Sequence, residues 1–202
     1  MKQVFFIHGG SAYSRYDDFL EALKTKELRS VTGESSERWS DNLRRDLGGQ
    51  TELFQPRMPN ADNAQYQEWQ IWFERHFSYL LDGVILVGWS LGGMFLAKYL
   101  LENDLPFRPS ALLLLAAPAG SCASEVGEDC GTFQFDPGRI EELATKMSNI
   151  QIWHSEDDFV VPYADALVYQ AALPQAKLVT FQDRNHFLLP QFPEFIEAIH
   201  SL

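Results

Sequence analysis

Short apolar runs divide the chain, and segments with helical periodicity lie between them. The runs are 4–7, 51–54, 84–87, 111–117, 150–153 and 177–181. Parallel strands need long crossovers that are usually helical, so this alternation predicts a mostly parallel sheet with helices on both faces. The runs 84–87 and 111–117 contain no polar residue, as expected for central strands that are covered on both faces. The sequence therefore predicts an α/β fold.

The helices can be placed from the spacing of their apolar residues. We expect them over 16–28, 39–47, 64–81, 91–103, 137–147, 163–173 and 193–199. Residues 30–38 are polar and predict a loop. Segment 118–147 is rich in glycine and proline and lies between two core strands. Such an insertion emerges beyond the strand C-termini, where ligands bind, so we expect a small substrate-facing cap on a single domain.

Charge and length limit the partners and the compartment. The 202 residues suffice for one domain with its own core. They include 16 basic and 28 acidic residues, giving a net charge of -12, which disfavours nucleic acid and anionic membrane surfaces as partners. No apolar stretch has the length of a signal-peptide core or a membrane span. We expect a cytoplasmic protein that does not insert into membranes and binds a neutral or basic small molecule.

Cys122 and Cys130 are the only cysteines of the chain. Two cysteines cannot form a four-cysteine zinc site, and no nearby histidine has ligand spacing. In a reducing compartment we expect two free thiols in a loop, with a local disulfide as the alternative.

Gly88-Trp89-Ser90-Leu91-Gly92 lies between the apolar run 84–87 and an expected helix. This is the strand-turn-helix context in which G-x-S-x-G forms a nucleophile elbow. The serine of an elbow has a strained backbone, and the glycines on either side allow close backbone packing. Ser90 is therefore the candidate nucleophile, and a tight turn with an idle hydroxyl is the alternative.

A serine nucleophile needs a histidine base, and that histidine needs a carboxylate on its other nitrogen. Acids at 156–158 follow the run 150–153, and His186 follows the run 177–181. The order serine, acid, histidine is the order of hydrolases with this type of elbow. His186 is the candidate base. His76, His154 and His200 lie in a helix, at a strand end and near the C-terminus, where we expect structural or exposed side chains.

Acyl transfer also needs hydrogen-bond donors for the oxyanion. The amide of Leu91, directly after the nucleophile, is the first candidate, and the second comes from Gly10 or Ser11 in the loop after the first strand. His8 in the same loop is expected to brace it rather than to transfer protons.

Candidate substrate-binding residues lie near these positions. Gly9 lets the backbone approach a substrate, and Trp89 neighbours Ser90. Phe133 and Phe135 belong to the expected cap and would line its substrate side. In contrast, the aromatic residues of segment 69–77 have helical spacing and are expected in the core.

These residues together resemble the α/β-hydrolase superfamily, through His8-Gly9-Gly10, the elbow at 88–92, Val160-Val161-Pro162 and Asn185-His186-Phe187. Within it, Met58-Pro59-Asn60, Trp69 and the small size resemble the compact serine hydrolases related to retinoblastoma-binding protein 9. The resemblance implies six or seven strands, a minimal cap and a triad of Ser90, Asp158 and His186. It places the acid four residues before Pro162, which selects Asp158, with Asp157 as the alternative.

We therefore expect a serine hydrolase that cleaves a small carboxylic ester, thioester or amide through an acyl-enzyme on Ser90. Its partner is a small-molecule acyl substrate, and the mechanism requires no metal or organic cofactor. The alternatives are an acyltransferase with the same triad and a non-catalytic binding protein on a hydrolase scaffold.

Overall fold

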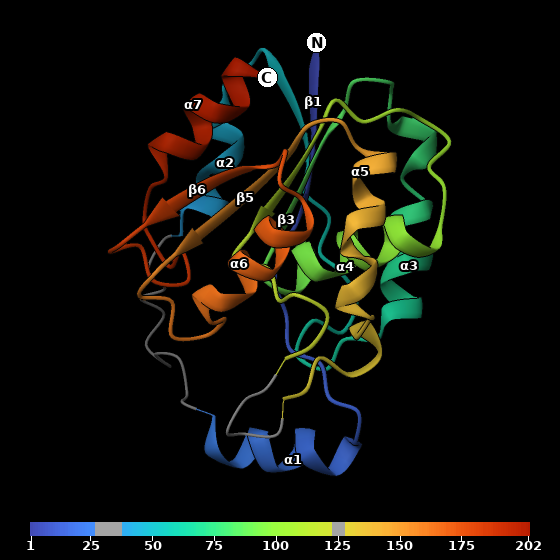
Figure 1. The fold of residues 1–202 in the computed structure, drawn as a ribbon, viewed down its shortest axis with the longest axis vertical. Coiled ribbons are helices and arrows are strands. Elements are labelled where there is room, and N and C mark those ends of the chain that lie inside the picture. The colour runs from blue at the N-terminus through green and yellow to red at the C-terminus, as the bar shows by residue number, and fades with distance from the viewer. Residues whose placement is uncertain (27–37, 123–127) are drawn as a thin grey trace.

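A computed structural model describes residues 1–26, 38–122 and 128–202. Within them, six strands form one sheet in the order β2-β1-β3-β4-β5-β6, and every strand pair is parallel (Figure 1). The strands are β1 (Lys2–Ile7), β2 (Thr51–Phe54), β3 (Ile85–Trp89), β4 (Ala111–Leu115), β5 (Ile150–Ser155) and β6 (Lys177–Phe181). The predicted α/β class is confirmed, and the apolar runs 84–87 and 111–117 do form the central strands β3 and β4.

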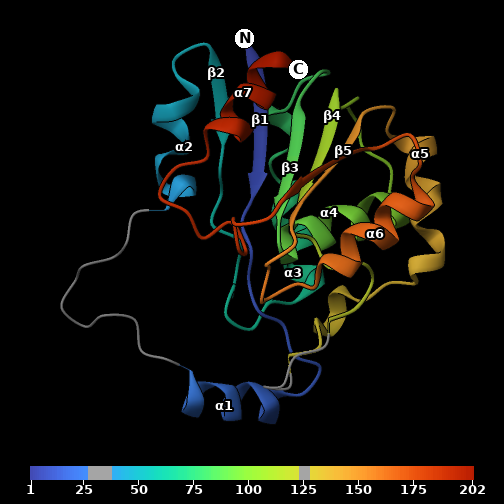
Figure 2. The same cartoon turned by 60° about the vertical axis from the view of Figure 1, so that its left-hand side comes forward.

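Helices cover both faces of the sheet, as Figure 2 shows with α2 and α7 on one face and α3 to α6 on the other. The helices are α1 (Tyr16–Thr25), α2 (Trp39–Leu47), α3 (Tyr66–Glu74), α4 (Leu91–Glu102), α5 (Leu143–Lys146), α6 (Tyr163–Ala172) and α7 (Pro193–Ser201). Short 3-10 helices are η1 (Phe77–Tyr79), η2 (Gly131–Phe133) and η3 (Pro137–Glu142).

The core has two parts because successive strand residues point to opposite faces. In β1, Phe5 and Ile7 join a cluster with α3, α4 and α6. Val4 and Phe6 join a second cluster with α2 and α7. The sheet is thus buried on both faces. A site can therefore form only at the ends of its strands.

Two predicted helices are interrupted. The helix expected over 64–81 divides into α3 and η1, and next to this break Nδ1 of His76 donates to the carbonyl of Trp72 at 2.7 Å. The helix expected over 137–147 divides into η3 and α5. Helix α1 ends at Thr25, and residues 27–37, which include most of the loop predicted at 30–38, lie outside the described residues.

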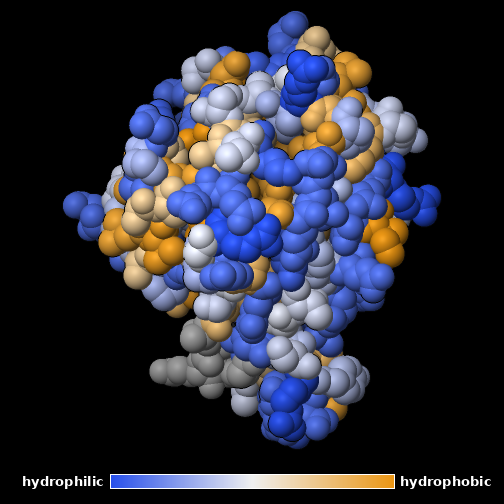
Figure 3. Space-filling model, turned by 45° about the vertical axis from the view of Figure 1, so that its right-hand side comes forward, coloured by the Kyte–Doolittle hydropathy of each residue, from blue (hydrophilic) through white to orange (hydrophobic). Residues whose placement is uncertain are grey.

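Helix α1 lies apart from the rest of the fold, beyond the C-terminal ends of the strands (Figures 1 and 2). Ala22 is its buried residue, whereas Tyr16, Leu20 and Leu23 are exposed. Figure 3 shows this end of the molecule as a narrow, largely hydrophilic projection. No helix within the described ranges is long and apolar enough to cross a membrane.

Most of the described part of the segment predicted as a cap belongs to the helical layer. The side chains of Phe133, Ile140 and Leu143 are buried in the cluster of α3, α4 and α6. The segment packs against α4 through these apolar side chains. The sequence pattern alone does not reveal this contact.

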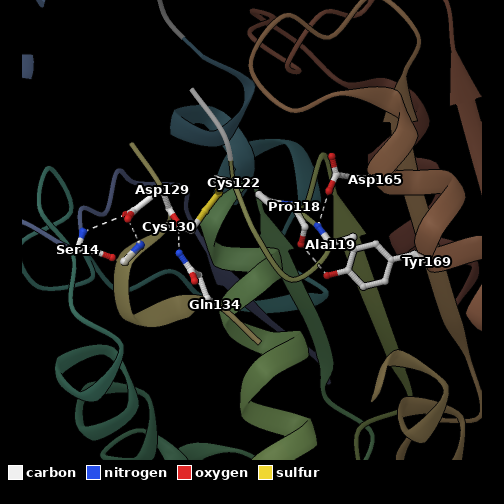
Figure 4. Close-up of a disulfide and its surroundings, with 10 residues drawn as sticks. Ser14, Pro118, Ala119, Cys122, Asp129, Cys130, Gln134, Asp165 and Tyr169 are labelled. Atoms are coloured by element: carbon white, nitrogen blue, oxygen red, sulfur yellow. Dashed lines mark hydrogen bonds between the residues drawn. A yellow bond between two sulfur atoms is a disulfide. The ribbon is translucent and has the colours of Figure 1, made fainter. Parts of the chain in front are cut away.

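Cys122 and Cys130 form a disulfide, with Cα atoms 5.3 Å apart (Figure 4). The expectation of two free thiols is therefore wrong. Cys130 is buried and has a left-handed backbone, with a φ of 62°, which marks a turn of the chain at this residue. Such a turn is not visible in the spacing of the cysteines.

Candidate active site

Ser90 occupies the sharp turn between β3 and α4. Its φ of 57° and ψ of -126° are a backbone conformation that a residue with a side chain rarely adopts. The turn is held from both sides, because the Ser90 amide donates to the carbonyl of Leu115 at 2.8 Å and the Ser90 carbonyl accepts from the amide of Gly93 at 2.9 Å. This is the geometry of the predicted elbow, and it carries the hydroxyl at the C-terminal end of the central strand.

Glycines make the elbow possible through close backbone approach. A Cβ on Gly92 would strike the carbonyl oxygens of Ile7 and His8, and one on Gly88 would strike the carbonyl of Gly92. Gly9 lies directly against the serine, since a Cβ there would be 3.0 Å from Ser90 Cβ and 3.4 Å from Oγ. The β1 exit loop therefore passes beside the Ser90 hydroxyl.

Asp158 and His186 meet although 28 residues separate them. Nδ1 of His186 donates to Oδ2 of Asp158 at 2.8 Å. The other carboxylate oxygen accepts from the amides of Val160 and Val161 at 2.8 and 2.9 Å. Burial of this carboxyl opposes its ionisation, but hydrogen bonds from His154 and His186 outweigh burial and hold the pKa of Asp158 well below its usual range. Asp158 is thus an ionised, fixed acceptor for His186.

Asp157, the alternative acid, has different partners. Its Oδ1 accepts from the Ser155 hydroxyl at 2.5 Å and from the amide of Asn185 at 2.9 Å. The Ser155 hydrogen bond lowers the pKa of Asp157. Asp157 therefore ties the turn after β5 to the turn that carries His186, without contacting the imidazole through a hydrogen bond.

Trp89 holds the backbone of the histidine. Its Nε1 donates to the carbonyl of His186 at 3.1 Å, and the two rings lie 5.7 Å apart. The indole is buried against Trp39, with ring centroids 6.0 Å apart. Trp89, which directly precedes Ser90, thus holds the loop that carries His186. Its place in the sequence did not indicate this role.

One of the two candidate loop donors for the oxyanion is already engaged. The amide of Ser11 donates to the carbonyl of Ala61 at 2.8 Å, so the prediction that Ser11 could serve is wrong in this conformation. Within the described residues, the amides of Gly10 and Leu91 have no protein acceptor. A Cβ on Gly10 would lie 2.6 Å from the Ala61 carbonyl, which explains why glycine occupies this position.

His8 braces the same loop. Its Nε2 accepts from the amide of Met58 at 2.9 Å, while Nδ1 donates to the carbonyl of Gly9 at 2.6 Å. Burial lowers the pKa of His8, and the charge of Arg57 lowers it further against the effect of the Gly9 hydrogen bond. A neutral imidazole with both nitrogens engaged fits bracing rather than proton transfer.

The disulfide segment supports this loop from outside. Oδ1 of Asp129 accepts from the amides of Ser14 and Gly131, each at 2.9 Å (Figure 4). Gly131 also lies against the backbone of Tyr13, where a Cβ would approach to 3.2 Å. The disulfide therefore anchors a segment that contacts residues shortly after Gly10.

The predicted pocket residues of the cap pack in or against the helical layer. Phe133 is fully buried, with its ring 5.0 Å from that of Trp69. Phe135 is half-buried and packs against the same cluster. The expectation that Phe133 lines the substrate pocket is wrong, since its side chain fills the helical layer, whereas for Phe135 it stays a prediction. Phe159, Val160 and Leu188, which are close to Asp158 or His186 along the chain, are exposed.

No protein-family model matches the chain, and no curated protein matches it by sequence. Solved structures do match it. The ydeN gene product from Bacillus subtilis is 22% identical, with a TM-score of 0.74 over 100% of this chain and 98% of that one. A meta-cleavage product hydrolase from Pseudomonas fluorescens is 14% identical, with a TM-score of 0.64 and coverage of 100% and 90%. Est1E from Butyrivibrio proteoclasticus, bound to ferulic acid, is 14% identical, with a TM-score of 0.59 and coverage of 100% and 87%. The chain has the α/β-hydrolase fold.

Proposed function

We propose that this protein is a serine hydrolase that cleaves small carboxylic esters through an acyl-enzyme on Ser90. The observation that carries the proposal is the 2.8 Å hydrogen bond from His186 to the buried Asp158, at the same end of the sheet as the strained turn of Ser90. A histidine oriented by an ionised carboxylate is the base that a serine nucleophile requires. Thioesters and amides undergo the same chemistry and belong to the same proposal.

The geometry suggests the role of each group. With Nδ1 donating to Asp158, Nε2 of His186 is the nitrogen that takes the proton from Ser90 Oγ as this oxygen attacks the acyl carbonyl. The amides of Leu91 and Gly10 stabilise the oxyanion. His186 then gives its proton to the leaving group, and water attacks the acyl-enzyme by the reverse use of the same base. Asp158 remains ionised throughout, in keeping with its low pKa.

The surface beside the triad favours an apolar, uncharged substrate. Phe159 is 71% exposed, Val160 50% and Leu188 44%, and they adjoin Asp158 and His186 in the chain. Exposed apolar side chains in such a position gain from covering an acyl chain or leaving group. A net charge of -12 disfavours anionic substrates at long range.

The test combines a fluorophosphonate probe with p-nitrophenyl acetate and butyrate. We expect wild type to be labelled and to turn over both esters, and Ser90→Ala and His186→Ala to lose both properties. The exposed Ser78 and His200 provide matched controls, so Ser78→Ala and His200→Ala should behave like wild type. A folded wild type that is neither labelled nor active would overturn the proposal and favour a binding protein.

Acyl transfer is distinguished from hydrolysis by the fate of the acyl group. Adding a primary alcohol to the ester assay should leave most of the acyl group in the free acid if water is the natural acceptor. A product dominated by the new ester at low alcohol concentration would instead identify a transferase.

A further inference from the structure

A second imidazole, that of His154, lies against the carboxylate of Asp158. His154 is at the end of β5 and is 1% exposed. Its Nε2 lies 3.4 Å from Oδ2 of Asp158, the same oxygen that accepts from His186 at 2.8 Å. One carboxylate oxygen therefore has two histidines on it, and only one of them is explained by the triad.

The protonation of His154 follows from its other partner. Nε2 also lies 2.9 Å from the carbonyl oxygen of Val161, which can only accept a hydrogen bond, so Nε2 carries hydrogen. The N–H is therefore directed at a region where the Val161 carbonyl and the Asp158 carboxylate lie together. Val161 also donates its own amide to Oδ1 of Asp158 at 2.9 Å. His154 and Val161 thus hold the carboxylate through both oxygens.

The groups around Asp158 increase the effect of the hydrogen-bond donor of His154. Helix α6 brings a second carboxyl, Asp165, whose Oδ1 accepts from the amide of Ala119 at 2.7 Å (Figure 4), and it interacts electrostatically with both His154 and Asp158. The ring of Tyr163 packs edge-on against His154 with centroids 5.8 Å apart. Two carboxyls near each other in a buried place repel when ionised, and a hydrogen-bond donor beside one of them offsets that repulsion.

We propose that His154 is a positioning residue of the active site, which keeps Asp158 ionised and its Oδ2 aligned with Nδ1 of His186. The inference rests on the proposed function and deepens it. His154 does not touch substrate and exchanges no proton in the reaction. Its effect passes through Asp158 alone, which separates this role from that of an ordinary buried strand residue.

Two amide variants test the role of the Nε2 hydrogen. In His154→Gln, the side-chain amide reaches about the position of Nε2 and can donate to the same two oxygens, whereas in His154→Asn it reaches only about the position of Nδ1. Hydrogen bonds to charged groups contribute enough that we expect kcat of His154→Asn to fall about tenfold, with KM unchanged. His154→Gln should recover most of this loss. Equal activity of the two variants would overturn the inference.

The pH profile gives a second readout. The hydrogen bond from His154 lowers the pKa of the Asp158 carboxyl. Loss of this donor in His154→Asn raises that pKa, so the decline of kcat/KM at acid pH should begin at a higher pH than in wild type. Within the described residues, the titratable groups that contact or interact with His154 and Asp158 are His186, Asp165 and Tyr163. A kcat loss without any movement of the acid limb would assign His154 a merely structural role.

A double-mutant cycle with Asp158→Asn shows whether His154 acts through the acid. On that background, adding His154→Asn should change kcat by less than twofold, because the carboxylate it serves is already gone. A full additional tenfold loss would contradict the inference. Circular dichroism and thermal melting of each variant establish that the comparison is made between folded proteins.

Fluorophosphonate labelling distinguishes a failure of the proposed function from a failure of the inference about His154. If wild type is not labelled at Ser90, the proposed function fails and the role of His154 falls with it. If wild type is labelled and active but His154→Asn retains its kcat and pH profile, only the inference about His154 fails.

Discussion

Removal of the disulfide should lower the thermal stability of the protein by an amount that its loop length sets. Cys122 and Cys130 are 8 residues apart, and the chain-entropy model assigns a cross-link of that span about 2.5 kcal/mol. The unfolding entropy of a chain of 202 residues then converts this loss into a fall in Tm of about 6 °C. We expect this shift in the variant in which both cysteines become alanine.

The assay is thermal unfolding followed by circular dichroism, with and without a thiol reductant. Wild type should show the shift when reductant is added, while the double variant should melt at the same lower temperature in both conditions. Because Asp129 holds Ser14 beside the candidate oxyanion loop, the rate of Ser90 labelling should fall together with Tm. Melting temperatures that agree within 1 °C for the oxidised wild type and the double variant would refute the reasoning.

Three further predictions concern the site. Gly10→Ala places a Cβ 2.6 Å from the Ala61 carbonyl, so the loop must shift, and we expect kcat to fall about 100-fold in a folded protein; a kcat within threefold of wild type would exclude Gly10 as a donor. The pKa of Asp158 is lower in the folded protein, so its ionisation stabilises the fold above pH of about 4 and this contribution is lost as pH falls. In Asp158→Asn, Tm should therefore fall less steeply than in wild type as the pH is lowered below about 4. An equally steep fall in both proteins would contradict this prediction. Phe159→Ser should raise KM for p-nitrophenyl butyrate but not for the acetate, and equal changes for both esters would show that this side chain covers no acyl chain.

The fold could be predicted to a large extent because its signals are local. The runs 84–87 and 111–117 are apolar throughout, and only a central strand buried on both faces tolerates this in a domain of this size. The turn at Ser90 was equally predictable, since the glycines around it are required by close backbone contacts. The order of Ser90, the acid and His186 predicted a candidate site at one end of the sheet, and Asp158 and His186 do meet in the structure.

Contacts between distant segments were not predictable from such signals. The engagement of the Ser11 amide depends on the Ala61 carbonyl, 50 residues away. Phe133 fills a space between aromatic rings of α3 and α4, and its burial could not be distinguished from pocket lining by its place in a glycine-rich segment. The pairing of Cys122 with Cys130 and the approach of His154 to Asp158 likewise depend on how loops turn in space.

The order of the candidate triad along the chain has a consequence for synthesis. Ser90 is synthesised before Asp158, and Asp158 is synthesised before His186. An elbow formed early on β1, β3 and α4 would carry a serine without its base, and the base is fixed only when β5 and β6 join the sheet. On the proposed function, a growing chain therefore has no activity toward esters until β5 and β6 have folded and His186 lies beside Asp158.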